Sequence, residues 1–236
     1  MLLPIFHLSV FSLYAYSLWY DQQYLDLPLP AKGYESMPFR ARLMFLTIWC
    51  LILQTVYFFV ALLNDLVGSS EASPRKPPLI RLLKDTLFGL AFTMAVYVAG
   101  SFWSIYHFDK ELIFPERIAK LFPTWLNHSM HTVVALSILL ELLLTNKTYP
   151  SRKVGVTVAL TFFVSYLVWM HILYERMGAW PYPIFSVLNL PARIVFFIAS
   201  ITIGLSFYVL GEKLNSFVCP AVTPKKQKED RKQKRR

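Results

Sequence analysis

The chain has 236 residues, of which 56% are hydrophobic and 16% aromatic, and its mean hydropathy is +0.45. Charged residues make up only 16% of the chain, whereas a soluble domain carries about 25%. This shortage of charge argues against a soluble enzyme. The net charge of +10 does not indicate nucleic-acid binding, because the positive residues lie in the connections between long apolar stretches.

The apolar residues form stretches long enough to cross a membrane. A bilayer core about 30 Å thick requires about 20 apolar residues per helix, and a helix pairs its backbone groups within one span. The sequence therefore predicts an all-α polytopic membrane protein with six transmembrane helices. The predicted spans are residues 2–20, 43–64, 86–106, 124–145, 154–174 and 194–211. The first is interpreted as a retained span, because it lacks the basic n-region and A-x-A site of a signal peptide.

Positive charges predict the orientation of these helices. The connections after spans 2 and 4, together with the C-terminal tail, hold two thirds of the 24 Lys and Arg residues. Positively charged loops remain in the cytosol, so both termini are predicted to be cytosolic. We expect one membrane domain, residues 1–215, and a basic disordered cytosolic tail, residues 216–236. Both the plasma membrane and the endoplasmic reticulum fit this topology.

Polar residues inside the spans are the candidates for function, because they are costly in a membrane. Thr47 lies about 6 Å from the luminal end of span 2 and His131 about 10 Å from that of span 4, at 1.5 Å per residue. Asn127 and His128 lie one turn before His131 and are predicted to share its face. A histidine can take the proton of a threonine hydroxyl and make its oxygen a nucleophile. The sequence therefore suggests a hydrolytic pair within the membrane.

Other interpretations fit the same residues. A threonine in a membrane helix often bonds the carbonyl four residues earlier or packs at a helix crossing, and a histidine can simply bridge two helices. His128 and His131 have a spacing that can hold a metal, as in a metal-dependent lipid enzyme. No further ligand motif follows, so no metal or cofactor is predicted. Glu141 is interpreted as the partner of a neighbouring helix. The lack of repeats disfavours a transporter.

Five segments of the chain resemble, in the same order, one family of small multi-pass membrane proteins. They are LIFP (112–115), WLNHSMHT (125–132), YPSRKVGVT (149–157), WPYP (180–183) and YVLGEKLN (208–215). The family comprises the androgen-induced and the androgen-dependent TFPI-regulating proteins. The resemblance covers nearly the whole chain, and the basic tail is more similar to the androgen-dependent branch.

The resemblance implies an activity. The family is known for hydrolysing fatty acid esters of hydroxy fatty acids with an intramembrane threonine and a histidine. The family's threonine matches Thr47, which follows Phe45 and Leu46, and its histidine matches the second histidine of N-H-x-M-H-T, His131. We therefore expect a threonine ester hydrolase that acts on a lipid substrate in the bilayer.

The resemblance leaves the remaining roles open. Asn127 and His128 are candidates for stabilising the oxyanion or for orienting His131. Arg40 and Arg42 are candidates for contacting the carboxylate of the substrate. The alternative function is a non-catalytic membrane regulator of another protein's expression or surface activity, such as that of a coagulation inhibitor. The oligomeric state is not predicted.

Overall fold

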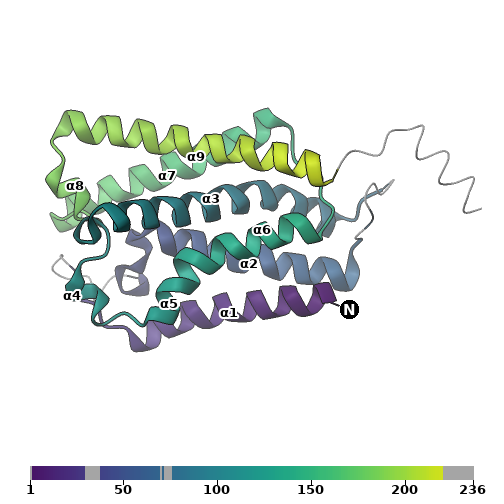
Figure 1. Cartoon of the computed structure of the whole chain (residues 1–236), viewed down its shortest axis with the longest axis horizontal. Helices are drawn as coiled ribbons and strands as arrows, with labels where there is room; N and C mark the ends of the chain where they lie inside the picture. The colour runs from purple at the N-terminus through teal and green to yellow at the C-terminus, as the bar shows by residue number, and fades with distance from the viewer. Residues whose placement is uncertain (1, 30–37, 70, 72–75, 220–236) are drawn as a thin grey trace, which may run out of the picture.

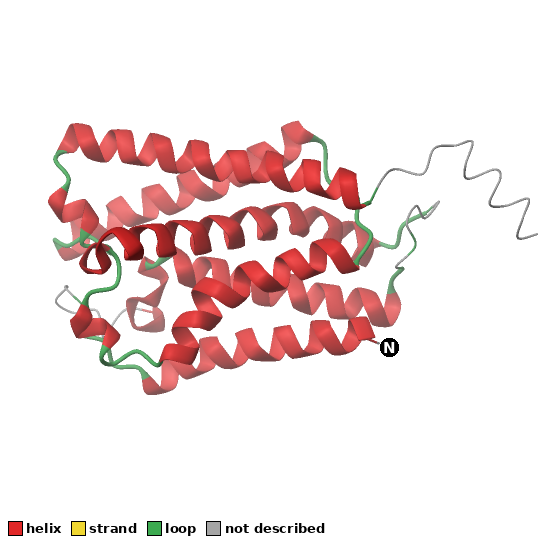
Figure 2. Cartoon of the chain, in the orientation of Figure 1, coloured by secondary structure: helices red, strands yellow, loops and turns green. Residues whose placement is uncertain are grey.

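A computed structural model describes residues 2–29, 38–69, 71 and 76–219. The regular structure of these residues is entirely helical (Figure 2). Six helical segments are long and apolar enough to cross a membrane, which confirms the predicted fold class. They are α1 (Leu2–Tyr24), α2 (Leu46–Val67), α3 (Leu79–Asp109), the continuous α5, η4 and α6 (Thr124–His128, Ser129–Val133 and Val134–Leu144), α7 (Arg152–Met177) and α9 (Leu190–Val218).

The bundle is organised around α3. This helix contacts α2, α6, α7 and α9, while α1 packs on α2 at one side (Figure 1). The start of α1 and the end of α9 lie at the same end of the bundle, here called the terminal end. The opposite end, here called the α8 end, carries four short elements. They are η2 (Pro38–Met44), η3 (Lys110–Leu112), α4 (Glu116–Ala119) and α8 (Ile184–Val187).

Most helix boundaries differ by a few residues from those that the sequence predicts, and three of the differences bear on the fold. Helix α3 begins at Leu79 rather than at residue 86, because Arg81 bonds Asp85 at 2.9 Å and keeps a charged first turn helical. Helix α2 begins at Leu46 rather than at residue 43, because the preceding residues form η2. Helix α9 continues to Val218, past residue 211, where the sixth predicted span ends, and past residue 215, where the predicted membrane domain ends. Residues 220–236 lie outside the described part of the chain, so the tail remains a prediction.

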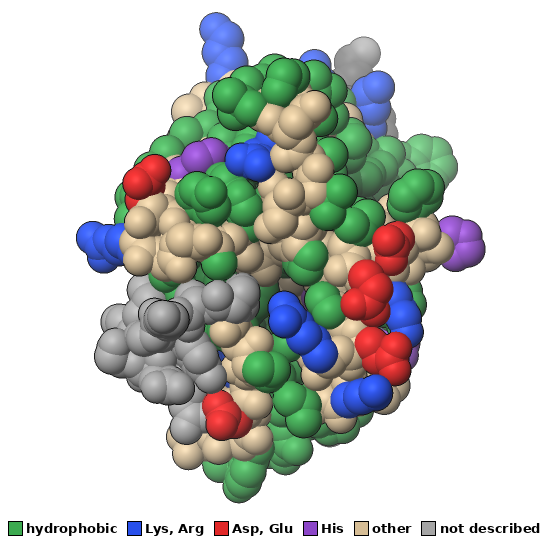
Figure 3. Space-filling model, turned by 90° about the vertical axis from the view of Figure 1, so that its left-hand side faces the viewer, with side chains coloured by type: hydrophobic (Ala, Val, Ile, Leu, Met, Phe, Trp, Pro, Cys, Tyr) green, Lys and Arg blue, Asp and Glu red, His purple; other side chains and the backbone are tan. Residues whose placement is uncertain are grey.

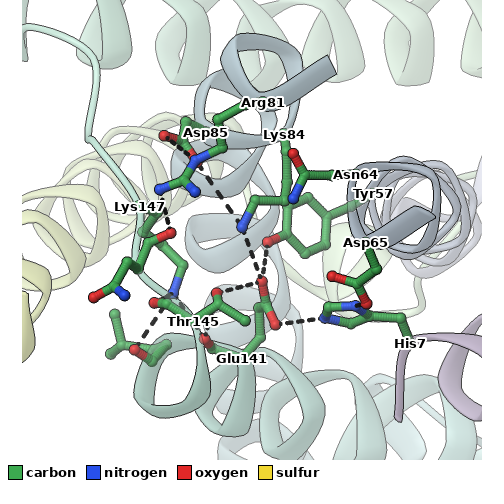
Figure 4. Close-up of polar contacts among 12 residues, drawn as sticks. His7, Tyr57, Asn64, Asp65, Arg81, Lys84, Asp85, Glu141, Thr145 and Lys147 are labelled. Carbon is green, nitrogen blue, oxygen red and sulfur yellow. Dashed lines mark hydrogen bonds and ion pairs between the residues drawn. The ribbon is translucent and has the colours of Figure 1, made fainter. Parts of the chain in front are cut away.

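A buried polar cluster joins the helices at the terminal end (Figure 4). Glu141 of α6 accepts hydrogen bonds from His7 Nε2 at 2.9 Å, from the Tyr57 hydroxyl at 2.6 Å and from Thr145 Oγ1 at 2.7 Å. The other ring nitrogen of His7 lies 2.6 Å from Asp65. An imidazolium is the form that donates from both nitrogens and satisfies both carboxylates. The prediction that Glu141 pairs with neighbouring helices is confirmed, and α1 is tied into the bundle.

Small residues let α9 approach its neighbours closely. Gly204 of α9 faces Phe163 of α7, and Gly155 of α7 faces Tyr208 of α9. A Cβ atom at either glycine would collide with the facing ring. Such close approach is a common basis of helix association in membranes, where the hydrophobic effect does not drive helices together.

Candidate active site

The hydroxyl of Thr47 meets the imidazole of His131 at the α8 end of the bundle. Thr47 lies in the first turn of α2, and His131 lies in η4, within the fourth membrane-spanning segment. The distance from Thr47 Oγ1 to His131 Nε2 is 3.1 Å. The similar depths of the two residues allow this contact if spans 2 and 4 are neighbours, and the structure contains it.

The surroundings of His131 assign its protons. Its Nδ1 atom lies 3.0 Å from the backbone oxygen of Asn127 and 2.8 Å from the Asn127 side-chain oxygen. A backbone oxygen can only accept, so Nδ1 must carry the hydrogen. In the neutral ring, Nε2 then has a free lone pair directed at the Thr47 hydroxyl. Because His131 is only 6% exposed, bulk water does not compete for this lone pair.

A π-helical turn directs His131 toward Thr47 and leaves His128 outside the site. Residues Ser129–Val133 form this turn, which is wider than an α-helical one. Positions three apart therefore no longer share a face, whereas Asn127 and His131, four apart, remain in contact. His128 is exposed, bonds Thr132 Oγ1 at 3.1 Å and lines neither cavity described below. The expectation that Asn127, His128 and His131 share a face is wrong for His128.

Two aromatic residues of α3 hold His131 from the other side. The Phe102 ring stacks on the imidazole, with centroids 3.6 Å apart and planes 12° apart. The Trp103 indole nitrogen donates to the His131 backbone oxygen at 3.1 Å and to Thr132 Oγ1 at 3.2 Å. These contacts fix the plane of the imidazole and supply a donor to a carbonyl within the π turn.

Tyr182 adds a second hydroxyl beside Thr47. It lies in the segment before α8, and its oxygen accepts the Leu46 backbone N–H at 2.9 Å. Tyr182 and Thr47 also line the same two cavities, which are described below. Tyr166 donates its own proton to the Met44 oxygen at 2.8 Å. Burial raises the pKa of Tyr182, so this hydroxyl keeps its proton at neutral pH and can donate it.

Thr47 lies where two cavities meet. The larger has a volume of about 340 Å³ and is lined by the end of α1, η2, α4 and the segment before α8. The smaller, of about 100 Å³, lies between α3, α7 and α9. Thr47, Phe102, Ile113 and Tyr182 line both. The cavities lie toward the end seen in Figure 3, where Lys, Arg, Asp and Glu side chains gather and hydrophobic side chains surround them.

Of the two arginines that are candidates for contacting the substrate carboxylate, the structure describes the side chain of one. Arg42 is 2% exposed and lines the larger cavity together with Asp21, Arg117 and His131. The side chain of Arg40 lies outside the described part of the chain. Within the described residues, no group of three or more His, Cys, Asp and Glu side chains is arranged to hold a metal ion.

Sequence reasoning missed Phe102, Trp103 and Tyr182. The WPYP segment (180–183) carried a signal for Tyr182, since two prolines around an aromatic residue indicate a fixed turn near the membrane interface. Nothing in the sequence distinguishes Phe102 or Trp103 from the other aromatic residues of the spans. Their role depends on how α3 packs against η4.

Comparisons with known proteins identify relatives along most of the chain. The sequence model described as FAR-17a/AIG1-like protein matches residues 3–216. The human androgen-induced gene 1 protein is 39% identical over 182 residues, which cover 74% of this chain and 76% of that protein. The androgen-dependent TFPI-regulating protein of Mesocricetus auratus is 32% identical over 219 residues, 89% of this chain and 90% of that protein.

A more distant relative is a UPF0641 membrane protein of Schizosaccharomyces pombe, which is 24% identical over 181 residues, 76% of this chain and 77% of that protein. No solved structure matches the chain. The six apolar helices and these membrane relatives together make the protein an integral multi-pass membrane protein. The match to the family model and the identities above show that the chain belongs to the FAR-17a/AIG1-like family.

Proposed function

We propose that this protein is an intramembrane ester hydrolase in which Thr47 is the nucleophile and His131 the general base. The observation that carries the proposal is the 3.1 Å contact between Thr47 Oγ1 and the free nitrogen of a histidine whose other nitrogen is held by Asn127. A nucleophile, a base and a group that orients the base are the recurring parts of a hydrolytic site. Asn127 takes the orienting role.

The reaction proceeds in two steps. His131 Nε2 takes the hydroxyl proton as Thr47 Oγ1 attacks the ester carbonyl carbon, and the tetrahedral intermediate collapses to an acyl-threonine. The leaving alcohol oxygen receives the proton from His131. A water molecule, deprotonated by His131, then attacks the acyl-threonine, and the proton returns to Thr47 as the fatty acid leaves.

Tyr182 is the donor that this proposal assigns to the oxyanion. Its hydroxyl accepts the backbone N–H of Leu46, the residue next to Thr47, and keeps its proton at neutral pH. Thr47 also lies in the first turn of α2, where the positive end of the helix dipole favours a developing negative charge. Hydrogen-bond donors that are fixed in a site with little water stabilise a developing negative charge more than the same donors do in solution.

The proposed substrate class is that of fatty acid esters of hydroxy fatty acids. The resemblance described above implies this class, and the geometry offers support. Such a molecule has two chains that diverge from one ester bond, and Thr47 is placed where two cavities diverge. The long exposed apolar faces of the surrounding helices keep the site within the bilayer, where a lipid ester is concentrated.

The decisive experiment labels the purified protein with a fluorophosphonate probe and maps the adduct by mass spectrometry. We expect the adduct on Thr47, and we expect neither labelling nor ester hydrolysis in Thr47→Ala or His131→Ala. Thr55→Ala is a matched control, because the Thr55 hydroxyl bonds the Leu51 oxygen of its own helix at 2.7 Å. Full hydrolysis by folded Thr47→Ala protein would contradict the proposal.

A regulatory function is the second candidate, because the names of several relatives describe a TFPI-regulating protein. The Thr47→Ala variant separates the two functions. If the protein regulates a partner without catalysis, the variant keeps the effect of the wild type on that partner in cells. If hydrolysis produces the effect, the variant loses it.

A further inference from the structure

Arg42 brings a buried positive charge to the larger cavity with one nitrogen left unpaired. Its Nε atom donates to Asp21 at 3.0 Å and its Nη2 atom to the Leu25 backbone oxygen at 2.9 Å. Its Nη1 atom is buried and has no hydrogen-bond partner in the structure of the described residues. A buried donor without an acceptor is costly and rare, so this nitrogen indicates a binding site for an anionic oxygen.

The backbone around Arg42 supports this interpretation. Phe39 and Ala41, in the turns before it, have φ angles of 53° and 57°, in the left-handed region that residues other than glycine rarely adopt. Such a conformation persists where the surrounding structure enforces it, and it is found often at ligand sites. Here it accompanies a segment that buries a guanidinium beside the cavity instead of exposing it.

The two cavities differ in charge. Among the described residues, Asp21, Arg42 and Arg117 line the larger one, so this part of its lining carries more positive than negative charge. The described lining of the smaller cavity contains no charged residue. A substrate that joins an anionic chain to an uncharged chain therefore has one orientation that matches both cavities.

We infer that Arg42 Nη1 binds the free carboxylate of the substrate and thereby decides which chain enters which cavity. The inference rests on the proposed hydrolase function and adds its specificity. The hydroxy fatty acid, which carries the carboxylate, occupies the larger cavity, and the fatty acyl chain occupies the smaller one between α3, α7 and α9. Arginine suits this role because guanidinium and carboxylate groups match in geometry and remain ionised.

The test compares two substrates that differ only at the carboxyl group. They are the palmitoyl ester of a hydroxystearic acid and the same molecule with its carboxyl group methylated. We expect wild-type kcat/KM to favour the free acid by about ten- to a hundredfold, as for a charge-assisted hydrogen bond. Arg42→Gln should lose this preference yet still hydrolyse the methylated substrate. Lys120→Gln, which removes an exposed charge outside both cavity linings, should keep the preference.

The outcomes separate this inference from the proposed function. Hydrolysis of neither substrate by the wild-type protein would contradict the hydrolase itself. Hydrolysis without a preference for the free acid, or a preference that persists in Arg42→Gln, would overturn the role of Arg42 and leave the hydrolase intact. If Arg42→Gln does not fold, product inhibition of the wild-type protein tests the role of Arg42 instead. The free hydroxystearic acid should inhibit more strongly than its methyl ester, and equal inhibition would overturn the inference.

Discussion

The ring of Phe102 lies against the imidazole of His131, with centroids 3.6 Å apart and planes inclined by 12°. Phe102 lies on α3 and His131 on η4, so the proposed base is fixed by contact between two membrane-spanning segments. A flat aromatic neighbour restricts rotation of the imidazole about its χ2 angle, and this rotation is what would move Nε2 away from Thr47.

Phe102→Leu tests this restriction. The substitution keeps a large apolar side chain, so it should cost less stability than a change to alanine, which costs about 3–5 kcal/mol. We expect kcat to fall several-fold and the rate of probe labelling at Thr47 to fall with it. Phe88→Leu is the control, since Phe88 is fully buried on the same helix and packs against Tyr57 and Tyr149. An equal loss of activity in both variants would show that general packing, not stacking on His131, is responsible.

Asn127→Leu tests how His131 is oriented. The backbone oxygen of Asn127 remains an acceptor in this variant, and only the side-chain oxygen at 2.8 Å is removed. We expect kcat to decrease by up to about tenfold, the value of one hydrogen bond, with KM unchanged. A change in KM alone would instead place Asn127 in contact with the substrate.

Tyr182→Phe tests the assigned oxyanion donor. The loss of one such donor lowers kcat by about 10²- to 10³-fold in a characterised hydrolase. We expect a fall of this order with little change in KM. Tyr174→Phe is the control, because Tyr174 stacks on Trp180 and lines neither cavity. Unchanged kcat in folded Tyr182→Phe protein would remove Tyr182 from the mechanism.

His7→Leu tests the buried cluster at the terminal end. Removing His7 leaves Asp65 and Glu141 without their shared donor, and breaking a buried ion pair costs roughly 3–5 kcal/mol. We expect a lower melting temperature in detergent and an unchanged labelling rate at Thr47 in the folded fraction. Adding Asp65→Asn should recover part of the loss, because it removes one uncompensated charge. Additive destabilisation by the two substitutions would contradict the ion pair.

The burial of Lys147 makes the stability of the folded protein depend on pH. It lies between α6 and α7, where burial lowers its pKa from 10.5 to about 8. Between these values the unfolded chain binds more protons than the folded protein, so stability should rise as pH increases from about 8 toward 10. Lys147→Met should flatten this rise. Lys153→Met, at an exposed position on α7, should not. A melting temperature that falls over this pH range in the wild type would contradict the prediction.

The sequence predicts the fold but only part of the site, because the two depend on different physical signals. Hydropathy and length determine which residues enter the membrane, so all six spans were found. Depth along a helix is proportional to residue number, so Thr47 and His131 could be placed at similar depths, able to meet if their spans are neighbours. The rotation of side chains around a helix depends on its local winding. The π turn at Ser129–Val133 has no clear sequence signal, which is why His128 was assigned to the wrong face.

Contacts between distant segments could not be predicted in the same way. The pairing of His7 with Glu141 and the stacking of Phe102 on His131 require the packing order of the helices. The charges around spans 2 to 6 indicate orientation and say nothing of which helices are neighbours. For the same reason the unpaired nitrogen of Arg42 appears only once Asp21 and Leu25 are placed around it.

The bond between His7 and Glu141 has a consequence for the biogenesis of the protein. The ribosome makes α1 before α6, and Glu141, the partner of His7, follows His7 by 134 residues. Until the fourth span has been inserted, the polar ring of His7 must be accommodated by the translocon, by lipid head groups or by Asp65 alone. Helix α1 is therefore made well before the partner that fixes it, and a chain interrupted before α6 presents a polar histidine in α1 that quality-control factors of the membrane can recognise.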